Sequence, residues 1–195
     1  MRRIAIRTPG GSLGFANPKL LLALALVIAL AVFLKVSNPH KEFSTSDYWA
    51  SAALADVAAV PEEALLPGNR NGPVLMWAAM QVDDPEIIRA LIERGADPDE
   101  SDPFFKGTPL TAAATYGRHP EILAELVKHG ADVNKRVHAG ETALLLAARY
   151  NTNPGIVAEL IRLGADRSAE NALGQDALDL ASKEGNRNAM AELSR

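Results

Sequence analysis

The sequence predicts an all-α fold: a solenoid of helix–turn–helix repeats with β-turn or hairpin loops, preceded by a single N-terminal transmembrane helix. Three observations support this prediction. An unbroken apolar run near the N-terminus has the character of a membrane span. A Gly-Ala-Asp triplet recurs at a nearly constant spacing, and an alanine-rich segment recurs in phase with it. Apolar residues make up 48% of the chain but aromatic residues only 5%, which favours closely packed helices over a β-rich core.

The N-terminal part is predicted to be a basic segment, residues 1–17, followed by a transmembrane helix or signal anchor, residues 18–37. Its apolar run, LLLALALVIALAVFL, covers residues 20–34 and is flanked by Lys19 and Lys35. A helix of that length spans roughly 22 Å against a hydrocarbon core of about 30 Å, and both lysines can reach the interface. The alternative is a cleaved signal peptide, which would release the protein into the periplasm. The residues after the run, KVSNPHKE, contain no small-x-small cleavage pair, which favours the uncleaved anchor.

The distribution of charge predicts the orientation and excludes one class of partner. More basic residues lie before the apolar run than after it, which puts the N-terminus in the cytoplasm and the remainder on the periplasmic side, beyond a polar tether at residues 38–46. Residues 1–41 carry six of the 20 basic side chains and no acidic one, so 14 basic and 24 acidic side chains remain and the rest of the chain has a net charge of −10. So acidic a domain repels a phosphate backbone, and we expect no nucleic-acid partner.

A repeat of 34–35 residues occupies the rest of the chain. The Gly-Ala-Asp triplet begins at Gly95, Gly130 and Gly164, each time after an apolar stretch such as ILAELVKHGAD. The in-phase segments read PVLMWAA, TPLTAAA, TALLLAA and DALDLAS. Their equivalent leucines are Leu75, Leu110, Leu144 and Leu178.

Each unit has the signals of two helices. Threonine or aspartate can cap the first helix, and its paired alanines allow the second helix to approach closely. Aspartate or asparagine can cap the second helix, with proline at its first position, where the missing N–H costs nothing. Apolar residues at positions i, i+1, i+4 and i+5 form its buried stripe, and glycine ends it as a left-handed cap.

This pattern resembles the ankyrin repeat, most closely at Thr108-Pro109-Leu110 and in the three Gly-Ala-Asp triplets. The resemblance implies a helical stack that binds other proteins. The histidine of the family motif is absent from every unit, which leaves the usual hydrogen bonds between repeats without their donor. The predicted units are residues 69–101, 102–135 and 136–169, and a truncated, polar cap at 170–195.

Residues 47–68 are interpreted as a degenerate first repeat, so that the repeat domain covers residues 47–195. Asp47 and Asp56 can cap its helices, and Pro61 shortens or kinks the second one. Six apolar residues are expected to cover the end of the stack: Trp49, Leu54, Val57, Val60, Leu65 and Leu66.

The sequence contains no pattern of catalytic or metal-binding residues. It has no cysteine, which excludes thiolate metal sites and cysteine nucleophiles. Its four histidines are not spaced as a helical metal-binding pair, and no GxSxG, HExxH or phosphate-loop motif is present. Asp97, Asp132 and Asp166 share one repeat position and are interpreted as structural. We therefore expect no cofactor, no metal and no enzymatic activity.

The candidate site is a protein-binding surface. Ankyrin-like stacks commonly contact partners through the hairpin tips and the exposed ends of the first helices. Tyr116 and Tyr150 share one repeat position and should lie side by side, and exposed aromatic residues suit a binding site. Alternatively, the tyrosines cover the stack and Phe104 and Phe105 fold back onto it. The candidates, matched by repeat position, are Asn69, Arg70, Met80, Gln81, Phe104, Phe105, Thr115, Tyr116, His138, Glu141, Arg149, Tyr150, Lys183 and Glu184.

Together these features predict a bacterial inner-membrane protein that presents an interaction module to the periplasm. One alternative is a structural or accessory subunit held permanently in a membrane complex. Another is a periplasmic protein that neutralises a toxic partner or confers stress tolerance.

The predicted topology can be tested with a reporter enzyme that is active only in the periplasm. Fused after Arg195, it is expected to be active in intact cells, whereas the same reporter fused before Met1 is expected to be inactive, because the basic flank holds the N-terminus inside. The opposite pattern of activity would reverse the orientation. Release of the C-terminal fusion into the soluble periplasm would indicate cleavage.

Overall fold

The repeat period appears in the structure as four consecutive pairs of antiparallel helices. The computed structural model describes residues 46–66, 73–103 and 106–195. These residues form helices and turns without a strand, and they belong to one compact unit, residues 42–195. The first helices of the pairs are α5 (Val74–Gln81), α7 (Pro109–Tyr116), α9 (Ala143–Tyr150) and α11 (Ala177–Glu184). The second helices are α6 (Pro85–Glu93), α8 (Pro120–Lys128), α10 (Pro154–Arg162) and α12 (Arg187–Leu193).

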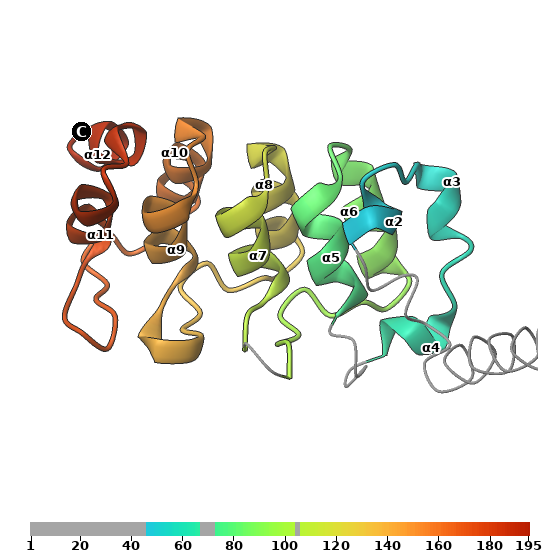
Figure 1. Ribbon diagram of the computed structural model, residues 1–195. Coiled ribbons are helices and arrows are strands. Elements are labelled where there is room, and N and C mark those ends of the chain that lie inside the picture. Colours follow the sequence, from blue (N-terminus) through green and yellow to red (C-terminus); the bar gives the residue numbers. More distant parts are fainter. Residues whose placement is uncertain (1–45, 67–72, 104–105) are drawn as a thin grey trace, which may run out of the picture. The chain divides into compact units, whose positions relative to one another are not determined.

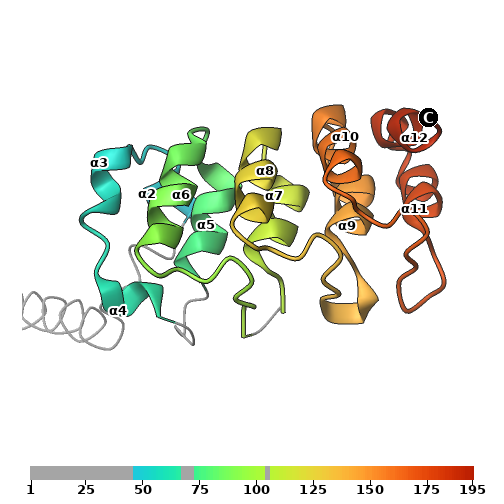
Figure 2. The ribbon, with the colours of Figure 1, turned by 180° about the vertical axis from the view of Figure 1, so that it is seen from behind.

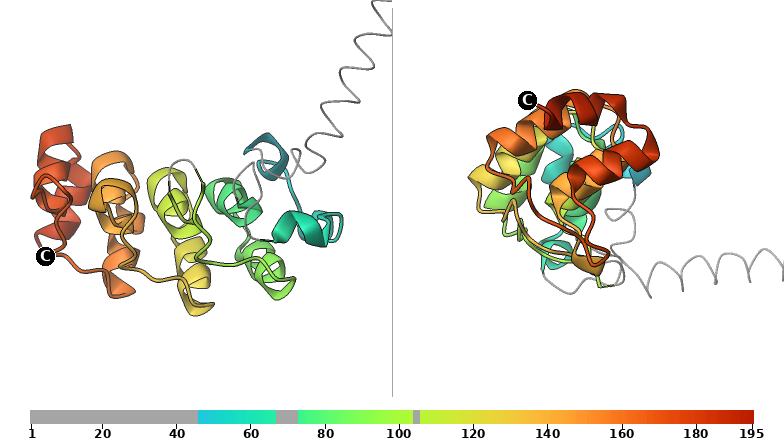
Figure 3. Two further views of the ribbon diagram at one scale, coloured as in Figure 1. Left: turned by 90° about the horizontal axis from the view of Figure 1, so that it is seen from below. Right: turned by 90° about the vertical axis from the view of Figure 1, so that its left-hand side faces the viewer.

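The pairs stack in chain order, so that first helices pack on first helices and second helices on second helices. The two rows of helices are visible from both sides of the stack (Figures 1 and 2). Viewed along the stack, successive units overlie one another (Figure 3). The fold is therefore the all-helical solenoid that the repeat period predicted.

The buried residues are those that recur in the sequence. Leu75, Leu110 and Leu144 are each 1% exposed, and the paired alanines that follow them are buried as well. The second helices bury the predicted stripe, for example Ile122, Leu123 and Leu126 in α8. Leu178, the fourth equivalent leucine, is 42% exposed. No described unit follows the fourth one to cover it.

The predicted caps are present at most of the helix ends. Thr108, Thr142 and Asp176 each accept a hydrogen bond from the backbone three residues later, at the start of α7, α9 and α11. At the end of α8, Gly130 has φ +104°, and the N–H of Ala131 donates to Leu126 O, the Schellman arrangement that satisfies a terminal carbonyl. His119 is the exception, because its side chain makes no cap hydrogen bond at the start of α8.

The N-terminal end of the stack is covered by three short helices of four residues each. Helix α2 packs on α5 and helix α3 on α6, in the places that a preceding repeat would take. Trp49 is buried here, but Leu54 and Leu66 are 47% and 59% exposed, so the prediction that they cover the stack is wrong. Asp56 lies inside α3 rather than before it, although its side chain accepts from Ala53 N. The three helices are α2 (Ser46–Trp49), α3 (Leu54–Val57) and α4 (Glu62–Leu65).

Side-chain amides connect the repeats, from positions that follow the first helix of a unit and differ from that of the absent motif histidine. Asn151 Nδ2 donates to Ala114 O and Gly117 O of the preceding unit, at 3.0 and 2.9 Å. Asn186 does the same one unit later, to Ala148 O and Asn151 O. Buried carbonyl groups that would otherwise lack a partner are satisfied in this way.

The triplet aspartates are structural, as predicted. Asp132 accepts from Asn134 N at 2.9 Å, which closes a turn after the glycine. Asn134 then connects to the next unit, because its side chain accepts from Asp166 N and donates to Gly164 O.

The predicted transmembrane helix, residues 18–37, and its flanking segments up to residue 45 lie outside the described residues. Within the described ranges, no helix combines the length and the apolar character needed to cross a bilayer.

Replacing Asn151 by alanine tests the amide connection between repeats. The substitution leaves two carbonyl oxygens without a partner at a residue that is 6% exposed, so the free energy of unfolding is expected to fall by about 1–3 kcal/mol. The measurement is urea unfolding of the purified protein, followed by far-UV circular dichroism. Asn188→Ala is the matched control, because it removes a solvent-exposed amide bond to Thr152 O. An equal loss in both variants would contradict a special role for Asn151.

Candidate functional site

The hairpins between units and the ends of the first helices form one groove of about 610 Å³. The hairpins project along one edge of the stack (the lower edge in Figure 1). The hairpins before α7, α9 and α11 are each closed by a backbone hydrogen bond at an equivalent position, for example from Val137 N to Glu141 O at 2.8 Å. Helices α5, α7 and α9 form the rest of the lining, so that three consecutive units contribute to one surface.

Seven of the predicted residues line this groove: Met80, Thr115, Tyr116, His138, Glu141, Arg149 and Tyr150. Gln81 and Met80 border a smaller pocket of about 140 Å³ near the N-terminal end, and Lys183 and Glu184 are exposed on α11. Asn69, Arg70, Phe104 and Phe105 lie outside the described residues.

The sequence prediction missed the apolar floor of the groove. Met76 and Trp77 line it from α5, Ala112 from α7, and Leu146 from α9. Each of these four residues lies four positions before a predicted one, at i and i+4 of the same helix. Helical spacing was therefore the signal that could have found them.

The two tyrosines are exposed rather than folded over the stack. Tyr116 and Tyr150 end α7 and α9, and they are 64% and 56% exposed. Thr115, the neighbour of Tyr116, is buried instead, and its hydroxyl donates to Thr111 O at 2.6 Å. The groove therefore has an apolar floor and an aromatic rim, which are features of protein-binding sites.

An ion pair lies in the groove wall. Arg149 Nη1 lies 2.8 Å from Glu141 Oε1, and the two side chains are only 17% and 10% exposed. The guanidinium also lies over the ring of Tyr150, 5.5 Å from its centroid. Burial opposes the charged form of Arg149, but the hydrogen bond with Tyr150 and the charge of Glu141 outweigh it and raise the pKa of Arg149 above its usual value. Arg149 therefore keeps its positive charge beside the carboxylate of Glu141.

Glu141 has more acceptor capacity than its described neighbours use. Its Oε1 atom accepts from Arg149 and, at 3.4 Å, from Asn171 Nδ2 of the next hairpin. Its Oε2 atom is buried and has no hydrogen-bond partner. A buried carboxylate oxygen without a donor is costly, which makes this atom the unusual feature of the site.

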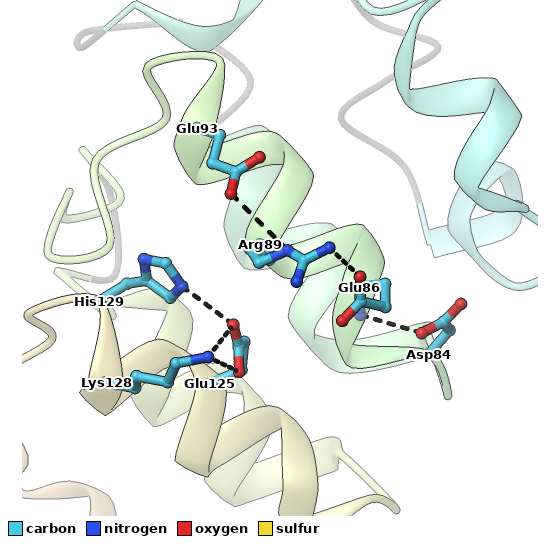
Figure 4. Close-up of polar contacts among 7 residues, drawn as sticks. All are labelled: Asp84, Glu86, Arg89, Glu93, Glu125, Lys128 and His129. Carbon is cyan, nitrogen blue, oxygen red and sulfur yellow. Dashed lines mark hydrogen bonds and ion pairs between the residues drawn. The ribbon is translucent and has the colours of Figure 1, made fainter.

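The row of second helices has a different chemistry. In α8, Glu125 contacts Lys128 and His129, and in α6, Arg89 lies between Glu86 and Glu93 (Figure 4). Burial would raise the pKa of Glu125, but the hydrogen bonds from Lys128 and His129 outweigh it and lower the pKa. Charges paired within one helix are typical of a solvated face.

Within the described ranges, no three His, Asp or Glu side chains are grouped so that they could hold a metal ion. What the groove offers chemically is apolar surface, aromatic rings and one ion pair.

Comparison with known proteins assigns the repeats. Residues 75–171 match the family model described as ankyrin repeats (3 copies), the repeat that the sequence resembles. The chain is 30% identical to the mouse ankyrin repeat and SOCS box protein 6 over 100 residues, which is 49% of this chain and 24% of the mouse protein. It is 31% identical to the human protein of that name over 81 residues, 40% of this chain and 19% of the human protein.

A shorter stretch of 48 residues is 50% identical to the phosphate system positive regulatory protein of Saccharomyces cerevisiae, covering 25% of this chain and 4% of the yeast protein. The chain therefore spans at most a quarter of the length of these relatives. Proteins built from ankyrin repeats are typically non-catalytic interaction modules, and the repeats imply a protein partner.

A double-mutant comparison tests the ion pair. Arg149→Met leaves the carboxylate of Glu141 buried without its cation, whereas Arg149→Met combined with Glu141→Gln removes both charges. We expect the single variant to be less stable than the double variant by roughly 1–3 kcal/mol, measured by urea unfolding at pH 7. Equal stability of the two variants would show that the carboxylate does not depend on Arg149.

Proposed function

We propose that this ankyrin-repeat protein is a membrane-anchored, non-catalytic interaction module whose groove across α5, α7 and α9 binds a protein partner. The anchor is residues 18–37, and the repeats face the periplasm of a bacterial cell. The partner meets the groove floor, the exposed tyrosines and the hairpin residues that line the groove, such as Val137, His138 and Ala139.

The position of the tyrosines carries this proposal. Tyr116 and Tyr150 occupy the same place in successive units, at the ends of α7 and α9, and both rings are more than half exposed. An exposed tyrosine buries a large area on binding and loses little conformational entropy, which is why tyrosine is enriched at binding hot spots. Behind them, Met76, Trp77 and Leu146 provide apolar surface for a partner side chain.

The anchor is supported by the sequence around it. An apolar run without a polar interruption, flanked by lysines, fits a membrane span, and the basic residues before it favour a cytoplasmic N-terminus. The acidic repeat domain, with its net charge of −10, would be repelled by an anionic membrane surface.

Replacing both tyrosines tests the binding surface. In the variant Tyr116→Ala, Tyr150→Ala, recovery of crosslinked partners from intact membranes is expected to fall at least roughly tenfold, since each hot-spot side chain is worth about 2 kcal/mol. The measurement is quantitative mass spectrometry after crosslinking and affinity purification of the full-length protein.

Leu173→Ala is the matched control for this experiment. Leu173 is 78% exposed at the fourth hairpin and does not line the groove. Its replacement removes exposed apolar surface outside the groove and is expected to leave recovery unchanged. If the tyrosine variant recovers the same partners in the same amounts, the groove is not the binding surface.

A further inference from the structure

We propose that the groove selects a segment of its partner that carries a cationic side chain, an arginine or a lysine, and that Glu141 is the residue that recognises this cation. This inference rests on the proposed function, since it names the chemistry of the partner that the groove binds.

The first step compares the hydrogen bonds that the carboxylate of Glu141 can accept with those that it receives. An ionised carboxylate can accept about four hydrogen bonds. Glu141 receives one strong bond, from Arg149 at 2.8 Å, and one long bond, from Asn171 at 3.4 Å. Its second oxygen is buried and has no donor, although the residue as a whole is 7% exposed and lines the groove. A donor that arrives with the partner would satisfy this oxygen, after a small rotation of the carboxylate about its terminal bond.

The second step is that two cationic side chains close to Glu141 in sequence, Lys135 and Arg136, donate hydrogen bonds to other acceptors. Arg136 donates to Gly140 O and, at 2.6 Å, to Glu170 O of the next hairpin. Lys135 donates to Asp99 O of the preceding unit. Within the described residues, Arg149 is thus the one cationic side chain paired with Glu141. Neither Lys135 nor Arg136 therefore supplies a second cation to this carboxylate.

The third step is the surroundings of the carboxylate. Trp77, Tyr116 and Tyr150 line the same groove, and aromatic rings attract a guanidinium or an ammonium group. Arg149 already lies over the Tyr150 ring, which shows that this wall accommodates a guanidinium. The apolar residues that line the groove lower the local dielectric constant, which strengthens the attraction between unlike charges.

The fourth step distinguishes a cation from an anion. An anionic side chain would bring a second negative charge to Glu141, and the guanidinium that could offset it is already paired. The repeat domain also carries a net charge of −10 beyond residue 41, which steers basic segments toward it and repels acidic ones. The groove volume of about 610 Å³ is in the range that holds a drug-sized ligand, so a short peptide stretch fits it.

A pair of capped peptides tests the inference on the full-length protein in detergent micelles. The peptides are acetyl-Ala-Leu-Arg-Phe-Ala-amide and the same peptide with citrulline in place of arginine, which keeps the shape of the side chain but removes its charge. Binding is followed by the fluorescence of Trp77, since Trp49 is buried at 1% exposure and the peptides contain no tryptophan. The arginine peptide is expected to bind wild type roughly tenfold more tightly than the citrulline peptide.

Two variants locate the source of this preference. Glu141→Gln keeps an acceptor for Arg149 but removes the charge, so the preference for arginine over citrulline is expected to fall to about one. Glu170→Gln removes a matched charge from an exposed residue of the next hairpin outside the groove, and the preference is expected to persist. If Glu141→Gln does not fold, as judged by circular dichroism, the two peptides still show on wild type whether the groove prefers arginine to citrulline. The same comparison on Glu170→Gln then shows whether that preference depends on the charge of the next hairpin.

Three outcomes overturn the inference: equal affinity of the two peptides for wild type, a preference that survives Glu141→Gln, or no binding of either peptide. The proposed function fails separately, through unchanged partner recovery in the tyrosine variant. If the tyrosine variant loses partners while arginine and citrulline bind equally, the groove is the binding surface but does not select a cation.

Discussion

Every helix pair in this protein depends on contact with the next pair. The first helices are eight residues long and the second helices seven to nine, which is too short for a helix to be stable in water on its own. Their apolar stripes are buried only because an equivalent stripe lies on each side. The small paired alanines, such as Ala113 and Ala114, let the backbones approach closely. The ends of the stack show the same constraint: four-residue helices cover the start, whereas Leu178 in the last unit stays partly exposed.

The groove is a consequence of this stacking. Because units follow one another in register, residues 34 positions apart, such as Tyr116 and Tyr150, are brought to the same surface. The caps and glycines that define each unit also decide where its hairpin projects, and hydrogen bonds between hairpins, such as Ala172 N to Ala139 O at 2.8 Å, keep these loops aligned. A binding surface assembled in this way needs several units and exists in none of them alone. The paired charges of the second helices make no comparable surface, since each charge finds its partner within its own helix.

Much of the fold could be predicted because its signals are local. Thr108 and Thr142 cap helices within three residues, and Gly130 ends a helix with a left-handed conformation. A few neighbouring residues are therefore sufficient to predict these helix ends. The candidate site was predicted in part for the same reason, since position within the repeat identifies the hairpins and helix ends. Predictions failed where packing against another unit decides. Leu54 and Leu66 have the composition of core residues, but the degenerate unit is too short to bury them.

The sequence by itself determined the period, the two helices of each unit, their caps and their buried stripes, because each of these follows from propensities and spacings over a few residues. Only the tertiary structure decided which hydrogen bonds join the units and which side chains line the groove. Asn151 finds carbonyls 34 and 37 residues earlier, and the pairing of Glu141 with Arg149 depends on how one hairpin folds back over its helix. The unpartnered oxygen of Glu141 has the same origin: the number of donors that reach a buried atom depends on every unit packed around it.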